Sequence, residues 1–201
     1  MTLKVALVIL AAGKSTRFPG NKLLAKIKGE SIIEKIVKTG LRSKVDMIIV
    51  VTGYEADKIR KEVEKLGNDR IKIVYNPDYE EGQSTSVKLG VREVIGKVEA
   101  VMIHPADVAL INPEDINRLI EVFQITSAPI VVASHGGRRG HPILFSNKIH
   151  EEIMMIREEK RGLKEIVEKY REDTVEVESS RFTIIDIDTP EDLKKVLENL
   201  Q

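Results

Sequence analysis

The sequence contains no cysteine among its 201 residues. Disulfide bonds, a catalytic thiolate and a zinc site with cysteine ligands are therefore excluded. Aromatic residues make up only 4% of the chain while hydrophobic residues make up 42%, so we expect a core built from Ile, Val, Leu and Ala. Basic and acidic residues number 32 each, whereas a chain that coats nucleic acid usually carries a basic excess. We expect no nucleic-acid partner, although this balance leaves room for a local phosphate site.

Long hydrophobic runs are also lacking. The apolar run at 3–10 is far shorter than the ~20 residues that a membrane helix needs, and it has no charged lead or cleavage site of the secretory kind. We therefore expect a cytoplasmic protein without membrane contact. A chain of 201 residues suits a single domain over residues 1–201.

Strand and helix patterns alternate along the chain. Helical periodicity occurs at 31–42, 55–66, 84–95, from Asn112 onward, at 148–170 with a break near Gly162, and from Thr189 onward. Strand patterns occur at 3–10, 47–51, 71–75, 98–103, 129–133, 142–146, 174–178 and 183–187. This alternation predicts a Rossmann-like, three-layer α/β/α sandwich with a mostly parallel mixed sheet. Because ligands of such sheets bind beyond the carboxyl ends of the strands, the loops at those ends are the candidate site.

A basic loop that contains glycine follows the first strand. Residues 10–24 read LAAGKSTRFPGNKLL. Backbone amides around Gly13 can point at phosphate oxygens, and Lys14, Arg17 and Lys22 add positive charge. The spacing is not that of a P-loop or of a dinucleotide fingerprint, since positions 8 and 15 are not glycine. An ordinary solvated turn is the alternative to a phosphate site.

A second candidate loop precedes the helix predicted at 84–95. Ser84 is placed to cap that helix, whose first amides and positive dipole end also suit an anion. The amide side chain of Gln83 can both donate to and accept from the edge of a nucleobase. A capping role of Ser84 and a nucleotide-binding role of this loop are compatible.

Two aspartates follow predicted strands. Asp107 comes just after the strand at 98–103, and Asp188 ends the strand at 183–187, where Asp186 points the same way. Mg²⁺ binds few protein carboxylates together with substrate phosphates and water, so a pair of this kind suits it. A role of Asp188 as a residue that merely starts the last helix is an equal alternative.

The segment 134–142 carries three glycines and two arginines, which suits an anionic ligand. A mobile, solvated hairpin is the alternative. The four histidines of the chain lie in different elements without ligand spacing, so we expect no zinc site.

The stretch LAAGKSTRFPGNKLL resembles the opening signature of the MobA-like nucleotidyltransferases, most closely the molybdenum cofactor cytidylyltransferase branch. Asp107, the Gly-His-Pro segment at 140–142 and the run DIDTPEDL at 186–193 resemble later motifs of that family. The chain departs from the family at Ala109, where proline is usual. The resemblance covers almost the whole chain and implies the glycosyltransferase-A-like fold.

The resemblance also implies roles for particular residues. It makes Arg17, Lys22 and Asp107 catalytic, and it makes Asp107 and Asp188 ligands of Mg²⁺. It places Gly140, His141 and Pro142 at the acceptor. The implied nucleotide contacts are Leu10, Ala11, Ala12, Gly13, Lys14, Ser15, Arg17, Lys22, Gly82, Gln83, Ser84 and Ser86.

The implied reaction transfers a nucleoside monophosphate from an NTP to a phosphorylated small molecule and releases pyrophosphate. The Ala-Ala-Gly form of the first loop favours CTP, molybdopterin is the implied acceptor, and a molybdoenzyme or its chaperone is the implied protein partner. Three alternatives stay open: a guanylyltransferase, transfer to a sugar or polyol phosphate, and a nucleotide-binding accessory protein without turnover.

Overall fold

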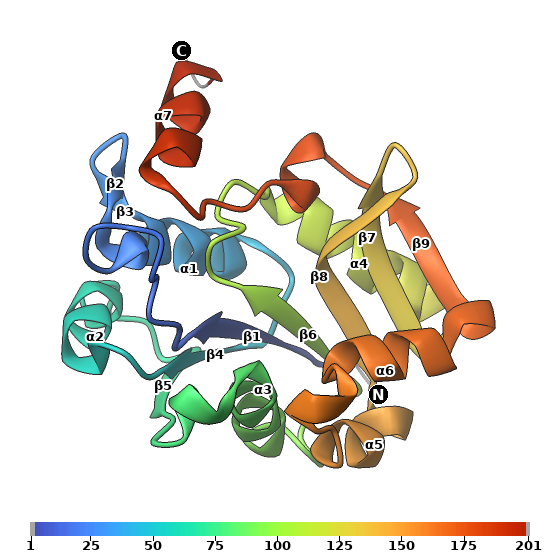
Figure 1. Ribbon diagram of the computed structural model, residues 1–201. Coiled ribbons are helices and arrows are strands. Elements are labelled where there is room, and N and C mark those ends of the chain that lie inside the picture. The colour runs from blue at the N-terminus through green and yellow to red at the C-terminus, as the bar shows by residue number, and fades with distance from the viewer. Residues whose placement is uncertain (1–2, 200–201) are drawn as a thin grey trace.

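A seven-stranded sheet forms the middle layer of the computed structural model, which describes residues 3–199 (Figure 1). The strand order is β5-β4-β1-β6-β8-β7-β9, and β8 is antiparallel to both of its neighbours while the other described pairs are parallel. The strands are β1 (Val5–Ala11), β4 (Met47–Thr52), β5 (Ile71–Tyr75), β6 (Ala100–Pro105), β7 (Ile130–His135), β8 (Arg138–Ser146) and β9 (Thr174–Glu178). The predicted mostly parallel mixed sheet is therefore confirmed.

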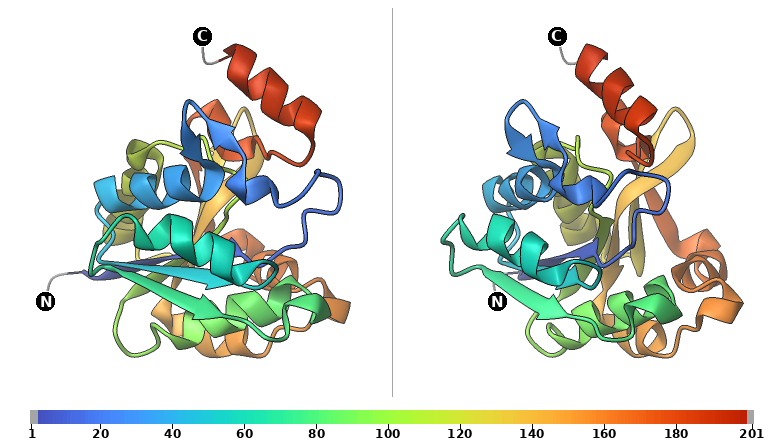
Figure 2. Two further views of the ribbon diagram at one scale, coloured as in Figure 1. Left: turned by 90° about the vertical axis from the view of Figure 1, so that its left-hand side faces the viewer. Right: turned by 60° about the vertical axis from the view of Figure 1, so that its left-hand side comes forward.

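Helices cover both faces of the sheet (Figures 1 and 2). Strand β1 shows why its sequence is apolar throughout: successive side chains point to opposite faces, and both faces are buried. Leu7 and Ile9 belong to one core cluster, Ala6 and Val8 to the other. The first cluster includes α1 (Ile32–Arg42), α2 (Ala56–Glu64) and α4 (Pro113–Thr126), and the second includes α3 (Gln83–Arg92), α5 (His150–Met154) and α6 (Leu163–Lys169).

Helix α7 (Pro190–Asn199) stands apart from the sheet, beside the small hairpin of β2 (Lys26–Ile27) and β3 (Glu30–Ser31), which the sequence did not predict (Figures 1 and 2). Helix α1 begins as expected, with the Ser31 hydroxyl accepting from the Glu34 amide at 3.3 Å. Helix α4 begins at Pro113 after Asn112, also as expected. Within residues 3–199, no helix combines the length and apolar character that crossing a membrane requires.

The strand predicted at 183–187 is wrong. Residues Arg181–Ile184 instead form a short 3₁₀ turn, η6, in which the Thr183 hydroxyl donates to the carbonyl of Ser180 at 2.8 Å. The chain then runs across the end of the sheet, where the Ile187 amide donates to the Asp107 carbonyl rather than to a strand neighbour. Asp186 is exposed, so the predicted strand pair of Asp186 and Asp188 does not form.

The loop predicted at 134–142 is mostly sheet. Strands β7 and β8 form a tight hairpin through Gly136 and Gly137, whose positive φ values of 55° and 76° match the turns that join antiparallel strands. Gly140, His141 and Pro142 therefore lie within β8. The break predicted near Gly162 in the helical segment 148–170 is confirmed, because α5 ends at Met154 and α6 begins directly after Gly162, with a 3₁₀ turn, η4 (Glu158–Lys160), between them.

The segment that follows the first loop is anchored to α2 through Glu62. Its carboxylate accepts hydrogen bonds from Lys65 and from Lys26 of β2, at 3.0 Å for Lys26, and these bonds lower the pKa of Glu62 from 4.5 to about 2. The contact holds η1 (Lys22–Leu24) and the hairpin behind it against the body of the fold.

We expect Glu62→Gln to remove a stabilisation that depends on pH. A carboxyl whose pKa is depressed on folding stabilises the protein above its unfolded value of 4.5, and this contribution is lost as pH falls towards about 2. The difference in unfolding free energy between wild type and Glu62→Gln should therefore be constant from about pH 7 to 5 and shrink below about 4.5. Urea denaturation across this range measures it. In the double variant Lys26→Met/Lys65→Met, which lacks the two donors, the effect of Glu62→Gln on the unfolding free energy should depend much less on pH. The same pH dependence as in wild type would contradict the assignment.

Candidate functional site

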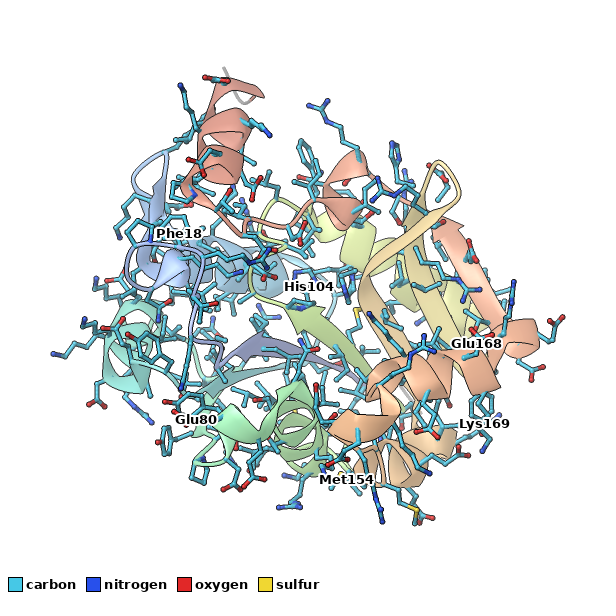
Figure 3. All side chains as sticks on the ribbon, in the orientation of Figure 1. Phe18, Glu80, His104, Met154, Glu168 and Lys169 are labelled. Carbon is cyan, nitrogen blue, oxygen red and sulfur yellow. The ribbon has the colours of Figure 1, made fainter. Side chains whose placement is uncertain are left out.

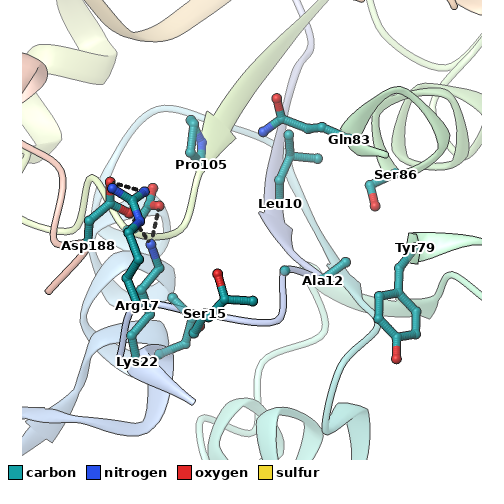
Figure 4. A pocket seen from close by; sticks show the side chains of 14 residues that line it. Leu10, Ala12, Ser15, Arg17, Lys22, Tyr79, Gln83, Ser86, Pro105 and Asp188 are labelled. Carbon is teal, nitrogen blue, oxygen red and sulfur yellow. Dashed lines mark hydrogen bonds and ion pairs between the residues drawn. The ribbon is translucent and has the colours of Figure 1, made fainter. Parts of the chain in front are cut away.

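Three segments that are distant in the sequence bring their charged side chains together at the carboxyl end of the sheet (Figure 4). The Nζ atom of Lys22 lies 2.7 Å from Oδ2 of Asp107 and 2.7 Å from Oδ1 of Asp188. Arg17 Nη2 lies 2.7 Å from the other oxygen of Asp188. The structure thus places both predicted cations and both predicted aspartates in one cluster.

Backbone contacts fix the two aspartates relative to each other. The Ala106 amide donates to the carbonyl of Leu10 at 3.1 Å, which ties the turn after β6 to the end of β1. The Ile187 amide donates to the carbonyl of Asp107 at 3.1 Å, so the segment that carries Asp188 is hydrogen-bonded to the Asp107 turn itself. At Gly140 a Cβ would lie 2.2 Å from the Thr183 carbonyl oxygen, so only glycine lets β8 and this segment approach so closely.

The start of α7 does not use the Asp188 side chain. Asp192 accepts hydrogen bonds from the amides of Asp188 and Thr189, at 3.2 and 2.9 Å, and the Thr189 hydroxyl accepts from the Asp192 amide at 3.2 Å. These reciprocal bonds satisfy the first amides of the helix. The Asp188 carboxylate is therefore left to face Lys22 and Arg17.

The charges in this cluster stabilise one another. Burial opposes the charged form of Lys22, but the attraction and hydrogen bonds of Asp107 and Asp188 outweigh it and raise the pKa of the lysine. The hydrogen bond from Lys22 is the main cause that lowers the pKa of Asp188, although burial acts in the opposite direction. Lys22 and Asp188 are therefore both ionised at neutral pH.

A cavity of about 270 Å³ opens beside this cluster (Figure 4). Ser15 has a left-handed backbone, and its buried hydroxyl has no hydrogen-bond partner among the described residues. The amides of Gly13, Ser15 and Thr16 likewise donate no backbone hydrogen bond within the described chain. A concave loop with free donors is suited to bind phosphate oxygens. The predicted residues that line this cavity are Leu10, Ala12, Gly13, Ser15, Arg17, Lys22, Gln83, Ser86, Asp107 and Asp188.

Four predicted nucleotide contacts do not line this cavity. Ala11 is buried in β1, and Lys14 turns away to pair with Glu80 at 2.7 Å. Gly82 and Ser84 lie at the start of α3, outside the cavity lining. Sequence reasoning also missed lining residues whose types carry no charge signal: Thr16, Leu23, Tyr79 and Pro105.

Ser84 does not cap α3 as predicted, because the helix begins at Gln83 and Ser84 already lies inside it. Its amide and hydroxyl both donate to the carboxylate of Glu158, at 2.9 and 2.6 Å. The hydrogen bond from the Ser84 hydroxyl is the main cause of the lowered pKa of Glu158. No local pattern indicates this contact, since 74 positions separate the two residues.

A second cavity, of about 550 Å³, adjoins the first and shares the side chains of Leu10, Gln83 and Pro105 with it. Of the three residues expected at the acceptor, Gly140 and His141 line this larger cavity, whereas Pro142 is buried and does not. Burial lowers the pKa of His141, whose Nδ1 has no partner among the described residues. His104, at the end of β6 in the middle of the molecule (Figure 3), is fully buried with its ring 6.3 Å from that of His141.

The two aspartates fit a hard divalent cation. Within residues 3–199 no cluster of three or more histidine and carboxylate side chains forms a complete metal cage. Two carboxylates that converge on one cationic atom, beside a loop with free donors, are nevertheless the kind of donor set that Mg²⁺ uses when substrate oxygens and water complete its shell.

Residues 7–175 match the model of the MobA-like NTP transferase domain. The chain belongs to this family. Relatives include the molybdenum cofactor cytidylyltransferase of Escherichia coli, 28% identical over 92% of this chain and 91% of that protein. A probable molybdenum cofactor guanylyltransferase of Aquifex aeolicus is also 28% identical, over 94% of this chain and 88% of that protein.

Solved structures share the fold of this MobA-like transferase. The crystal structure of Rv0371c from Mycobacterium tuberculosis has a TM-score of 0.85 at 22% identity, and the match covers 98% of this chain and 100% of that one. A second structure of that protein is a complex with manganese, with a TM-score of 0.79 at 21% identity over 97% of this chain and 98% of that one. The family assignment establishes a nucleotidyltransferase fold and reaction type.

We expect Lys22→Met to destabilise this transferase because it leaves two neighbouring carboxylates without their shared cation. The expected loss is about 1–3 kcal/mol in unfolding free energy at pH 7, measured by urea denaturation. Lys14→Met, in the same loop, removes a far more exposed ion pair and should change stability much less. Adding Asp188→Asn to Lys22→Met should restore part of the loss. An equal loss of unfolding free energy in Lys22→Met and Lys14→Met would show that the ion pairs of Lys22 with Asp107 and Asp188 do not stabilise the fold more than an exposed ion pair does.

Proposed function

We propose that this protein is a Mg²⁺-dependent cytidylyltransferase that transfers CMP from CTP to molybdopterin and releases pyrophosphate. The convergence of Lys22, Asp107 and Asp188 beside the first loop is the observation that carries the proposal. A cytidylyltransferase with molybdenum cofactor in its name, aligned over almost the full length of both chains, supports the choice of nucleotide and acceptor. The proposal includes a single-domain, cytoplasmic enzyme that delivers its product to a molybdoenzyme or its chaperone.

The smaller cavity would hold the nucleotide. The free donors of the Gly13 loop and the exposed guanidinium of Arg17 would bind the β- and γ-phosphates, while Lys22 would bind the α-phosphate. Leu10, Ala12 and Gln83 would contact the nucleoside at the other end of the cavity, and Ser86 is held there by a 2.8 Å bond from Asn76.

Asp107 and Asp188 would hold the magnesium ion. When bound, Mg²⁺ supplies positive charge to the phosphate oxygens that gain negative charge during the transfer. The manganese complex of the fold relative from M. tuberculosis supports a divalent ion in this kind of fold.

Catalysis would rest on positioning and charge stabilisation. An oxygen of the acceptor phosphate forms a bond to the α-phosphorus as the bond from that phosphorus to the β-phosphate bridging oxygen breaks, and pyrophosphate leaves with that electron pair. The attacking phosphate is already an anion, so no side chain has to remove a proton. Lys22 would neutralise charge that grows on the α-phosphate from a position already fixed by two carboxylates.

The larger cavity would hold the acceptor. It adjoins the nucleotide cavity across Leu10, Gln83 and Pro105, so the two substrates would meet near Asp107. His141 lines it and would orient the acceptor with an uncharged ring, because burial disfavours its protonated form.

We expect Asp107→Asn to lower turnover by about 100-fold or more while the protein stays folded, because a neutral amide no longer compensates the metal charge. Pyrophosphate release with CTP, Mg²⁺ and molybdopterin measures turnover, and circular dichroism checks the fold. Unchanged turnover in excess Mg²⁺ would refute the metal assignment.

A panel of CTP, GTP, ATP and UTP separates the proposed activity from its alternatives. CTP should be preferred. Preference for GTP would favour the guanylyltransferase, to which one relative of equal identity points by name. Release with a sugar or polyol phosphate but not with molybdopterin would change the acceptor class, and nucleotide binding without release would indicate an accessory protein.

A further inference from the structure

A carboxylate is rigidly fixed in the wall of the larger cavity. Glu158, on the turn η4 that precedes α6, accepts from the amide and hydroxyl of Ser84 on a single oxygen, Oε2. Ser84 is buried at the start of α3, so the donors that hold Glu158 belong to the packed body of the fold. A Cβ at Gly82 would lie 2.5 Å from Cδ of Glu158, so the carboxylate fills space that only glycine leaves open.

No ion pair joins Glu158 to a cation among the described residues, although a hydrogen bond with the Gln83 backbone also helps to lower the pKa of its carboxyl. Glu158 is exposed and lines both the larger cavity and a further surface pocket. An ionised carboxylate can only accept hydrogen bonds, and one held at the positive end of a ten-residue helix keeps its charge. Glu158 therefore presents an acceptor-only group to whatever occupies the cavity.

Aliphatic side chains form one part of the remaining wall, namely Leu10, Val87, Ile103, Val132, Ile143, Leu163 and Val167. The polar part consists of Gln83, Ser84, Arg139, His141, Arg161, Lys164 and a second carboxylate, Glu168. The aliphatic part suits the faces of a flat ring, whereas a polyol or sugar would gain little from contact with it. A flat ring with hydrogen-bond donors on one edge satisfies both the walls and the carboxylate.

Two cations lie on the same segment as Glu158. Arg161 and Lys164 line the cavity and form no ion pair with the residues that the structure describes. Unpaired cations in the wall of a cavity attract a ligand with negative charge. The cavity is therefore suited to an anionic molecule that carries a flat, amino-substituted ring.

We propose that Glu158 determines acceptor specificity by accepting hydrogen bonds from an amino group and an adjacent ring N–H of a pterin-class ring. This inference rests on the proposed function, which makes the larger cavity the acceptor site. It goes further in assigning recognition of the ring to one residue outside the family motifs. A ring with a carbonyl in place of the amino group would set its oxygen against the carboxylate and bind weakly.

The test compares pterin and lumazine, which differ in that a carbonyl of lumazine replaces the amino group of pterin. The full chain is titrated with each ring, with and without CTP in EDTA, and the quenching of ring fluorescence gives the dissociation constants. Wild type should bind pterin about 10- to 100-fold more tightly than lumazine. In Glu158→Gln the preference should fall to about threefold or less, because the new amide can donate to the carbonyl of lumazine.

Glu159→Gln is the matched control, since it removes the same charge from the neighbouring position, which does not line the larger cavity. It should keep the wild-type preference. Equal binding of both rings to wild type, no binding of pterin, or the same loss of preference in both variants would overturn the inference. A thermal melt of each variant checks that Glu158→Gln is folded.

Pyrophosphate release, measured separately, distinguishes this inference from the proposed function. Tighter binding of pterin than of lumazine, without pyrophosphate release from any nucleotide, would refute the transferase proposal and leave the proposed ring site standing. Release with a polyol phosphate, together with a larger KM for it in Glu158→Gln and no ring discrimination, would leave nucleotidyl transfer standing and overturn the pterin assignment.

Discussion

The ammonium group of Lys22 between Asp107 and Asp188 is the interaction on which the site depends. Two carboxylates brought this close would repel each other, and the lysine converts that repulsion into two short ion pairs. It also joins three parts of the chain: the loop after β1, the turn after β6 and the segment before α7. The same atom that stabilises the fold therefore lies where the proposed phosphate and divalent ion would meet.

The parallel sheet explains why these segments meet. Strands β1 and β6 are neighbours and run in the same direction, so their carboxyl ends deliver Lys22 and Asp107 to the same edge. Asp188 reaches that edge differently, on a segment that crosses the end of the sheet and is held by the Ile187 amide. Because no strand carries Asp188, its position depends on this backbone bond and on the close approach at Gly140.

Much of the fold could be predicted from sequence because it has local signals: unbroken apolar runs mark strands buried on both faces. The central cluster had weaker local signals, a basic loop with glycine and an aspartate beyond a strand, and the family resemblance was needed to bring Lys22, Asp107 and Asp188 into one site. The strand predicted at 183–187 failed because a short apolar run of β-branched residues does not reveal whether a neighbouring strand is available to pair with it. The contact of Glu158 with Ser84 could not be predicted, since it depends on how a turn packs against a distant helix.

The two cavities differ in the charges that line them, and residues of α3 line both. Gln83, its first residue, lines each cavity, and the next residue, Ser84, holds the carboxylate of Glu158 in the larger one. The positive end of the helix is thereby neutralised on the side of the larger cavity, while the cations of the first loop supply positive charge on the side of the smaller one. Under the proposed function, a triphosphate would meet the free donors of the Gly13 loop, Arg17 and Lys22 in the smaller cavity, whereas the larger one presents the Glu158 carboxylate beside Arg161 and Lys164. The nucleotide would therefore occupy the smaller cavity and the acceptor the larger one, where Glu158 would face the ring of the acceptor and the cations its negative charge.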